Sequence, residues 1–285
     1  MKYAWWANQR GEVVGTTVGL LWIFSCSRVR HFSLNLAALQ GLATMEEYSV
    51  SFNARPHIDA VQLKNGQTIF VVDNALDRPE RLVKLAHDFG AEFVHAEGSP
   101  YPGSQLLMPD DFSSRIDDFF RLHIRSRLKG RRSLRMYSRL SRVTMPAHLL
   151  DARQRICHRD SAGVDADHTI SASVLYLFDN PALGGTVFFE PVASDAVTES
   201  LVEDASNLSA AEFGIRHDWP PSYMTQSNAH FRVIGRVPAK WNRVIFYDGR
   251  IFHSSDIEWP ELLDDPAGMG RLTVNAFFTC TRPAQ

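Results

Sequence analysis

The short segment ICHRDSAG, residues 156–163, places two metal-capable side chains, His158 and Asp160, one residue apart. On an extended strand, the side chains at positions i and i+2 emerge on the same face. An imidazole and a carboxylate at this spacing can therefore approach one cation together. The spacing alone is a weak signal, because the chain has 11 histidines and many acidic residues that produce chance pairs.

A third ligand is expected far along the chain, in WNRVIFYDGRIFHSSDI, residues 241–257. His253 ends a β-rich run there, just after an Asp-Gly turn. Two histidines and one carboxylate hold Fe(II) on three adjacent positions and leave the others open for an organic ligand and oxygen. Taken alone, a histidine such as His253 is more often a hydrogen-bonded core residue than a ligand, and other histidines compete for the third position: His168, His217 and His230.

A candidate anion-binding pair follows in GRLTVNAFF, residues 270–278, where Arg271 and Thr273 stand at i and i+2 of a predicted strand. A guanidinium offers a planar fork for a carboxylate, and a hydroxyl adds one donor. A cation buried in a β core is costly without a partner, so this arginine should have one. The alternative is an exposed strand residue with no ligand.

The elements that must position these residues are mainly strands. An apolar run over residues 67–74 predicts a first strand. Short β-rich runs recur after Gly130, separated by Gly, Pro, Asp and Asn clusters, and they cover residues 134–145, 153–158, 168–178, 184–191, 230–237, 242–248, 250–253 and 271–278. Such a series predicts a sandwich or a barrel.

Two helices are expected ahead of these strands, over residues 78–90 and 110–130. The second has a helical apolar stripe, formed by Ile116, Phe119, Phe120, Ile124 and Leu128. Together they can cover one outer face of the β structure. The acidic, Ser-rich stretch 193–209 is interpreted as an inserted loop with a short helix.

The domain organisation is expected to be simple. With 285 residues, 45% of them hydrophobic, the chain can bury a sizeable core. Residues 45–285 are predicted to form one domain. Residues 1–44 lack a clear helix or strand period and are interpreted as an uncertain extension, with Met45 as the functional start. The apolar stretch 16–27 within them is too short to span a bilayer.

The charge and the cysteines exclude some classes of function. A net charge of −2 disfavours bulk attraction to nucleic acid or to an anionic membrane. The one dense basic run, residues 125–135, is interpreted as a solvated face at the end of a helix. Three cysteines without framework spacing favour free thiols and a reducing, cytoplasmic compartment, with Cys157 in the core rather than on a metal.

The order His-x-Asp, then SASVLYLFDNPALGGTVFFEP (residues 171–191), then His and Arg, resembles the iron(II)/2-oxoglutarate-dependent dioxygenases. Within them, the prolyl-hydroxylase-like branch shares the Tyr-Leu strand, the Gly-Gly-x-x-x-Phe turn and the His-Ser segment. The resemblance implies a mainly β (α+β) fold, a double-stranded β-helix or jelly roll, with its core at about residues 134–280 and the N-terminal helices packed on one face.

The resemblance also implies roles for individual residues. His158, Asp160 and His253 would be the Fe(II) ligands and catalytic centre. The co-substrate 2-oxoglutarate would be bound by Arg271, with two supporting contacts, Thr273 and Tyr176, and a weaker one from Asn275. Oxygen would be the second co-substrate, and succinate and CO2 the products. The carboxylate of Asp160 favours hydroxylation, because halogenating members of the family carry a small residue in its place.

This sequence departs from the family pattern in two intervals. The gap from His253 to Arg271 is long, and WPELLDDPAG, residues 259–268, is interpreted as the loop that fills it. The interval from Asp160 to His253 spans 93 residues (253 − 160). Two rival readings are a cupin-like metalloprotein that does not use 2-oxoglutarate and a catalytically silent jelly-roll binding module.

The expected partner is a small-molecule or peptidyl substrate, with no nucleic acid and no membrane, and the sequence indicates no oligomeric state. Aromatic residues are candidates for the rim of the substrate pocket: Tyr137, Trp219, Tyr223 and Trp241. Glycine motifs for nucleotides and a Gly-x-Ser-x-Gly elbow are absent from the sequence, which disfavours nucleotide-binding enzymes and nucleophile-type hydrolases.

Overall fold

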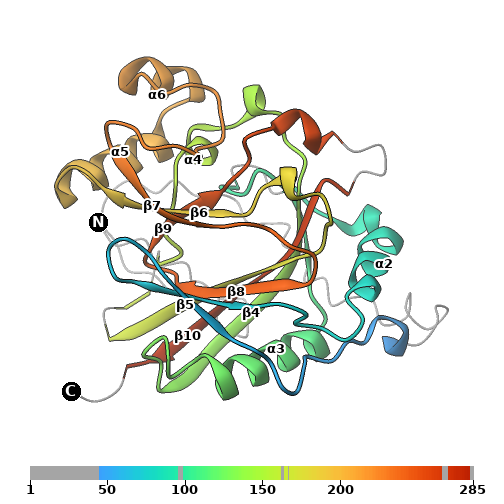
Figure 1. The fold of residues 1–285 in the computed structure, drawn as a ribbon. Coiled ribbons are helices and arrows are strands. Elements are labelled where there is room, and N and C mark those ends of the chain that lie inside the picture. Colours follow the sequence, from blue (N-terminus) through green and yellow to red (C-terminus); the bar gives the residue numbers. More distant parts are fainter. Residues whose placement is uncertain (1–44, 96–98, 162–163, 166, 265–268, 283–285) are drawn as a thin grey trace, which may run out of the picture.

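The computed structural model describes residues 45–95, 99–161, 164–165, 167–264 and 269–282. The predicted extension 1–44, with its apolar stretch, lies outside these residues. The described strands form two antiparallel sheets that face each other (Figure 1). The expectation of a mainly β chain with few helices is therefore confirmed. None of the described helices has the length and apolar character needed to cross a bilayer.

The larger sheet has seven strands, in the order β1 (Asp59–Gln62), β2 (Thr68–Val72), β8 (Arg243–Asp248), β5 (His168–Tyr176), β10 (Arg271–Thr281), β4 (Arg132–Val143) and β3 (Gly103–Leu107). The smaller sheet has the order β7 (Phe231–Val237), β6 (Thr186–Pro191) and β9 (Phe252–Ser255). Sequence-distant segments are thus neighbours: β10 pairs with both β4 and β5.

Strand β10 shows how alternation builds the two faces of the larger sheet. Val274, Ala276 and Phe278 point to the outer face and join one core cluster. Thr273 and Phe277 alternate with them and point to the inner face, between the sheets. Because both faces are covered, the strand is buried on both sides and reads as a nearly continuous apolar run.

The helices cover the outer faces of both sheets (Figure 1). The described helical segments are η1 (Met45–Tyr48), α2 (Glu80–Asp88), η2 (Gly90–Glu92), α3 (Asp110–His123), η3 (Ala147–Leu149), α4 (Ala152–Arg155), η4 (Pro181–Leu183), α5 (Asp195–Asn207), α6 (Ala210–His217) and η5 (Pro260–Leu263). Helices α2 and α3 pack on the larger sheet. Helices α4, α5 and α6 pack on the smaller one. The order of layers is therefore helix, sheet, sheet, helix.

Helix α3 is shorter than the predicted helix over residues 110–130. The N–H groups of Ile124 and Arg125 both donate to the Phe120 carbonyl, at 2.9 and 2.8 Å, and the second of these bonds breaks the regular i→i−4 pattern and ends the helix. A turn with Lys129 at φ 61° follows. The basic run 125–135 consequently lies across this turn and the start of β4 rather than at the end of a helix, with most of its basic side chains exposed.

The stretch 193–209 was wrongly predicted to be a loop with a short helix. It forms the 13-residue helix α5, which is followed directly by α6. The polar composition hides a narrow stripe in which Thr198, Leu201 and Ala205 are buried against the smaller sheet. A stripe of one residue per turn is enough to hold a helix once a sheet lies beneath it.

Phe120→Ala is expected to lower the free energy of unfolding by about 3–5 kcal/mol, because a fully buried aromatic side chain is replaced by a cavity. The Phe120 ring stacks on Phe278 at a centroid distance of 4.0 Å, which joins α3 to β10. Urea unfolding measures the change. On the same helix, Leu122 is 76% exposed, and Leu122→Ala should change stability by about 0.5 kcal/mol or less. Equal effects of the two variants would contradict the packing of α3.

Candidate metal centre and cavity

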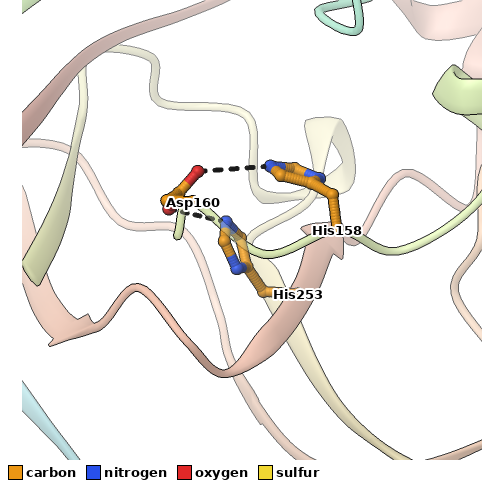
Figure 2. Close-up of side chains that lie close together, drawn as sticks. All are labelled: His158, Asp160 and His253. Atoms are coloured by element: carbon orange, nitrogen blue, oxygen red, sulfur yellow. Dashed lines mark ion pairs between the residues drawn. The ribbon is translucent and has the colours of Figure 1, made fainter. Parts of the chain in front are cut away.

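Three side chains from separate parts of the chain meet between the two sheets (Figure 2). One ligand atom from each of His158, Asp160 and His253 lies within 4.8 Å of the others. The Asp160 carboxylate lies 3.4 Å from His253 Nε2 and 3.7 Å from His158 Nε2. Within the described part of the chain, no other group of three His, Cys, Asp or Glu side chains converges in this way.

Backbone hydrogen bonds between segments hold the three residues together. His158 and His253 form an antiparallel bridge, with N–H···O distances of 3.0 and 2.9 Å in the two directions. His253 belongs to β9, where it pairs with Phe188 of β6. The Asp160 N–H donates to the Gly249 carbonyl at 2.7 Å, at the turn between β8 and β9. The turn between β8 and β9 therefore positions Asp160, and strand β9 positions His253 and, through the bridge, His158.

The local structure around His158 corrects two predictions. Residues 153–158 were expected to be a strand, but Ala152–Arg155 is the short helix α4. Its start is fixed by a capping box in which Asp151 and Gln154 bond each other's backbone. His158 lies in an isolated β-bridge and Asp160 in the following turn, so the pair does not share the face of a regular strand.

The hydrogen bonding of His253 prepares its ring for a metal. Its Nδ1 lies 2.9 Å from the Ile251 carbonyl and donates to it, which leaves the Nε2 lone pair directed at the shared point. Burial lowers the pKa of His253 to about 4, against the opposing effect of this hydrogen bond. The ring is therefore neutral at neutral pH, as a metal ligand must be. Among the described residues, no hydrogen bond reaches the His158 ring, which faces the cavity.

The Asp160 carboxylate is short of partners. Its side chain is only 10% exposed, and its Oδ2 atom is buried without a hydrogen bond. Burial raises the pKa of Asp160 to about 6, while His158 opposes that rise. A buried carboxylate oxygen without a donor is unfavourable unless a cation is bound beside it.

The distances fit a cation held by all three side chains. Ligand atoms about 2.1 Å from one metal and about 90° apart lie about 3 Å from each other. The observed carboxylate–imidazole distances of 3.4 and 3.7 Å need only small rotations to reach this arrangement. Two neutral imidazoles and one carboxylate form a donor set that suits Fe(II).

A second His-x-Asp pair, His57 and Asp59, shows what the motif does elsewhere in this chain. Its atoms approach to 3.0 Å, but the two side chains are 88% and 61% exposed. No third ligand joins them in the described structure. The competing histidines do not belong to the ligand group: His217 is paired with Asp204 at 2.9 Å, and its ring lies beside that of His230. His168 begins β5, where it contacts Asp165.

A cavity of about 530 Å³ opens beside the three ligands, and Arg271 lies in its wall. The side chain is 3% exposed, and its Nε and Nη2 donate to the carbonyls of Gly184 and Gly185 at 2.9 and 2.7 Å. Gly184 adopts a φ of +83°, and a Cβ there would lie 2.0 Å from the Asp256 carbonyl oxygen. The Gly-Gly turn thus brings two carbonyls to the guanidinium where side chains do not fit.

Arg271 has no carboxylate partner in the described structure. Burial raises the pKa of Asp256, and the charge of Arg271 opposes that rise, but the Asp256 carboxylate is paired with Arg236 at 3.1 Å. The guanidinium carbon of Arg271 instead lies 5.5 and 5.7 Å from the rings of Tyr176 and Phe178. A buried cation with two carbonyl acceptors and an adjacent cavity is suited to an anionic ligand.

The other predicted co-substrate residues lie around Arg271 at different depths. Strand register places Thr273 opposite Ser141 and Tyr176 on the inner face of the sheet. The Thr273 hydroxyl and the Asn275 Oδ1 atom are both buried without hydrogen bonds. Asn275 lines the cavity. Tyr176 is fully buried behind the cavity wall, and its hydroxyl lies 2.8 Å from Thr186 Oγ1.

Two tyrosines of the site carried no sequence signal. The Tyr101 hydroxyl is buried near Arg271 and Thr273 without a hydrogen bond. Burial raises the pKa of Tyr101, and Arg271 opposes that rise. Tyr101 lies in a Pro-rich loop that the sequence could not place. Tyr247 packs its ring 4.8 Å from the His253 ring, and burial raises its pKa well above the ordinary value. For Tyr247, the alternation of inward and outward side chains along β8 is the one feature of the sequence that could have indicated a position facing the site.

The aromatic residues predicted for the pocket rim divide into two groups. Tyr137 and Tyr223 line the cavity. Trp219 is buried among the helices on the smaller sheet, where its Nε1 donates to the Arg155 carbonyl, and Trp241 packs on the outer cluster of the larger sheet. Cys157 is buried as predicted and is not a member of the ligand group.

Comparison with known proteins adds a family and a set of distant structures. The model of a family of unknown function, DUF6445, matches residues 54–278. None of the curated protein sequences matches this chain.

Several solved structures resemble this chain at low sequence identity. HygX from Streptomyces hygroscopicus, with nickel and 2-oxoglutarate bound, is 13% identical, with 76% of this chain and 84% of that chain covered and a TM-score of 0.43. The non-heme alpha ketoglutarate dependent epimerase SnoN from nogalamycin biosynthesis is 13% identical, with 76% and 81% covered and a TM-score of 0.38. EvdO2 from Micromonospora carbonacea var. aurantiaca, complexed with 2-oxoglutarate, is 10% identical, with 81% and 96% covered and a TM-score of 0.37. The geometry of the site, rather than these distant likenesses, carries the functional assignment.

Proposed function

This chain belongs to the family of unknown function DUF6445, and from its ligand geometry we propose that it is a non-haem Fe(II)- and 2-oxoglutarate-dependent oxygenase. The proposed reaction is hydroxylation of an amino acid, a peptidyl residue or a small metabolite, with O2 as co-substrate and succinate and CO2 as products. The single observation that supports this most is the convergence of two imidazoles and one carboxylate beside a buried guanidinium that lacks an acid.

The proposed metal ligands are His158, Asp160 and His253. Together they occupy one side of the cation and leave its other side facing the cavity. The Ile251 carbonyl orients the His253 ring, and the bond from the Asp160 N–H to the Gly249 carbonyl fixes the Asp160 backbone, so only small side-chain rotations are needed on binding. When bound, iron supplies the oxidative chemistry, and the protein supplies binding, orientation and exclusion of water.

The proposed partner of Arg271 is the far carboxylate of 2-oxoglutarate. Among the described residues, none makes a hydrogen bond to the hydroxyls of Thr273 and Tyr101, and both hydroxyls can donate to the same carboxylate. Asn275 lies on the same wall. We propose that Tyr176 acts by positioning, since its ring packs on Arg271 and its hydroxyl is engaged with Thr186.

The proposed architecture is a double-stranded β-helix, or jelly roll, with its core at about residues 134–280 and residues 45–285 as one domain. The two facing antiparallel sheets and the site between them support it. The order of the Tyr-Leu strand, the Gly-Gly turn and the His-Ser segment supports placement near the prolyl-hydroxylase-like branch. The buried free thiols of Cys157 and Cys280 support a cytoplasmic location.

Anaerobic titration of the purified chain with Fe(II) and then 2-oxoglutarate tests this function without a known substrate. Chelation of the metal by the keto acid is expected to produce a metal-to-ligand charge-transfer band in the visible range. Admission of O2 should then yield succinate in an amount that depends on both additions.

The two rival functions give different results in this titration. A cupin-like metalloprotein would bind Fe(II) but show no charge-transfer band with 2-oxoglutarate. A silent binding module would bind no metal at the site. Either outcome would contradict the proposed function.

A further inference from the structure

The lining of the cavity carries more basic than acidic side chains. Three arginines line the cavity in addition to Arg271, namely Arg139, Arg153 and Arg159. Among the described lining residues, Asp160 is the only acid, and it is a proposed metal ligand. A bound divalent cation would make the cavity more positive still. A cavity lined by one sign of charge concentrates ligands of the opposite sign.

Arg139 is placed in this cavity by strand register. It lies on β4 opposite Asn275 of β10, on the inner face of the larger sheet. Its Nη1 donates to Gln105 Oε1 at 2.8 Å, and its guanidinium lies 5.5 Å from the Tyr137 ring centroid. No carboxylate lies within ion-pair distance of it in the described structure. Arg243 of β8, by contrast, is paired with Asp73 at 2.6 Å.

Arg159, which lies between His158 and Asp160 in sequence, also lines the cavity. Its guanidinium lies 4.5 Å from the Phe252 ring centroid, a stacking contact that holds it without neutralising it. It also has no carboxylate at ion-pair distance among the described residues. Two of the lining arginines, Arg139 and Arg159, therefore have no carboxylate partner among the described residues.

An aromatic surface lies beside these charges. Tyr137 and Phe277 stack with ring centroids 4.9 Å apart at an interplanar angle of 27°, and both line the cavity. Tyr223 also lines the cavity, and its hydroxyl donates a hydrogen bond to the Met145 carbonyl. The apolar faces of these rings suit the body of a ligand rather than its charged end.

We propose that the substrate of this site is a small organic anion, a carboxylate or phosphate on an apolar or aromatic body. Arg139 and Arg159 bind the oxyanion, and the Tyr137–Phe277 pair contacts the apolar part. The inference rests on the proposed function, because it assigns the second ligand of that same cavity. A volume of about 530 Å³ lies in the range of small-molecule sites, and it favours a free molecule over a peptide segment.

The test is equilibrium binding of matched probes to the full chain, measured by isothermal titration calorimetry. The chain is loaded anaerobically with Fe(II) and saturating 2-oxoglutarate, so that Arg271 is already occupied. The probes are 3-phenylpropionate, phenyl phosphate, the neutral 3-phenylpropanamide and the cation 3-phenylpropylamine. We expect an anion to bind at least about tenfold more tightly than the amide, and the amine to bind most weakly. The relative affinities of the two anions identify the oxyanion.

Substitutions connect this preference to the named residues. Arg139→Gln and Arg159→Gln are each expected to weaken anion binding by about tenfold, and the double variant more, because each removes a charge-assisted hydrogen bond. Binding of the neutral amide should change little. Arg121→Gln is the matched control, since Arg121 is an exposed arginine on α3, paired with Asp118. Equal binding of the anions and the amide, or no loss in the double variant, would overturn the proposal.

A second arm separates this proposal from the proposed function. The same probes are titrated into the metal-free chain without 2-oxoglutarate, in wild type and in the Arg139→Gln/Arg159→Gln double variant. An anion preference that the double variant lacks supports the arginine site even if no charge-transfer band forms with Fe(II) and 2-oxoglutarate. A charge-transfer band without any anion preference supports the oxygenase and overturns the substrate class.

Discussion

His158→Ala is expected to weaken Fe(II) binding by more than about 100-fold and to abolish 2-oxoglutarate turnover. Loss of an outer partner of a metal ligand already costs about 10- to 100-fold, and loss of the ligand itself should exceed this. The fold should persist, because the His158 side chain is 53% exposed and its ring makes no hydrogen bond in the described structure. Anaerobic Fe(II) titration and succinate assay measure the loss, and thermal unfolding measures the fold.

His57→Ala is the matched control for this variant. His57 belongs to the other His-x-Asp pair, with Asp59 at 3.0 Å, but lies on the surface without a third ligand. The His57→Ala variant should bind Fe(II) as tightly as the wild type does. His253→Ala should behave like His158→Ala, with a larger stability loss because the ring is buried and bonded to Ile251. An iron-loaded, active His158→Ala protein would remove this residue from the metal site.

Arg271→Lys and Arg271→Ala are expected to raise the 2-oxoglutarate requirement, the alanine variant by at least about 30-fold. Truncating one member of a buried, hydrogen-bonded charge pair costs about 2–5 kcal/mol, and each 1.4 kcal/mol is about tenfold. Lysine keeps the charge but cannot form a planar fork, so its effect should be intermediate. The concentration of 2-oxoglutarate that gives half-maximal charge-transfer absorbance measures the change.

Loss of structure must be distinguished from loss of the ligand contact in these variants. Arg271 also bonds the carbonyls of Gly184 and Gly185, so the alanine variant is expected to be less stable. The lysine variant, checked by thermal unfolding, keeps the prediction testable. Arg243→Lys is the control, because Arg243 lies on the same sheet but is paired with Asp73, outside the cavity lining. An unchanged requirement in both Arg271 variants would show that another cation binds the co-substrate.

The sequence by itself determined the strand-rich character of the chain and the order of its chemical groups. Runs such as residues 168–178 and 271–278 are apolar on both faces, and they became the central strands β5 and β10. An arginine inside such a run was expected to be buried, with an exposed strand residue as the alternative, and Arg271 is buried. Alternation also put Thr273 on the same face as Arg271. These conclusions needed only local periodicity, which a sequence displays directly.

Weak local signals were misleading where packing or capping decided the outcome. Residues 153–158 look like a strand, yet the Asp151–Gln154 capping box starts a helix there. The stretch 193–209 looks like a loop, but the smaller sheet gives α5 a surface to pack on. The short strands β1 and β3 were not expected, because Asp59–Gln62 is exposed and β3 begins at the end of a Pro-Gly loop.

Only the tertiary structure decided which histidines and acids meet. His57-x-Asp59 and His158-x-Asp160 have the same spacing, so the spacing alone cannot distinguish them. The bridge between His158 and His253 and the bond from Asp160 to Gly249 bring one pair to a third ligand, while the other stays in solvent. The packing of the loop and strand that carry Tyr101 and Arg139 likewise places these two residues in the lining of the cavity. The physical reason is that a site is formed by contacts between residues far apart in the chain, and periodicity carries no information about such contacts.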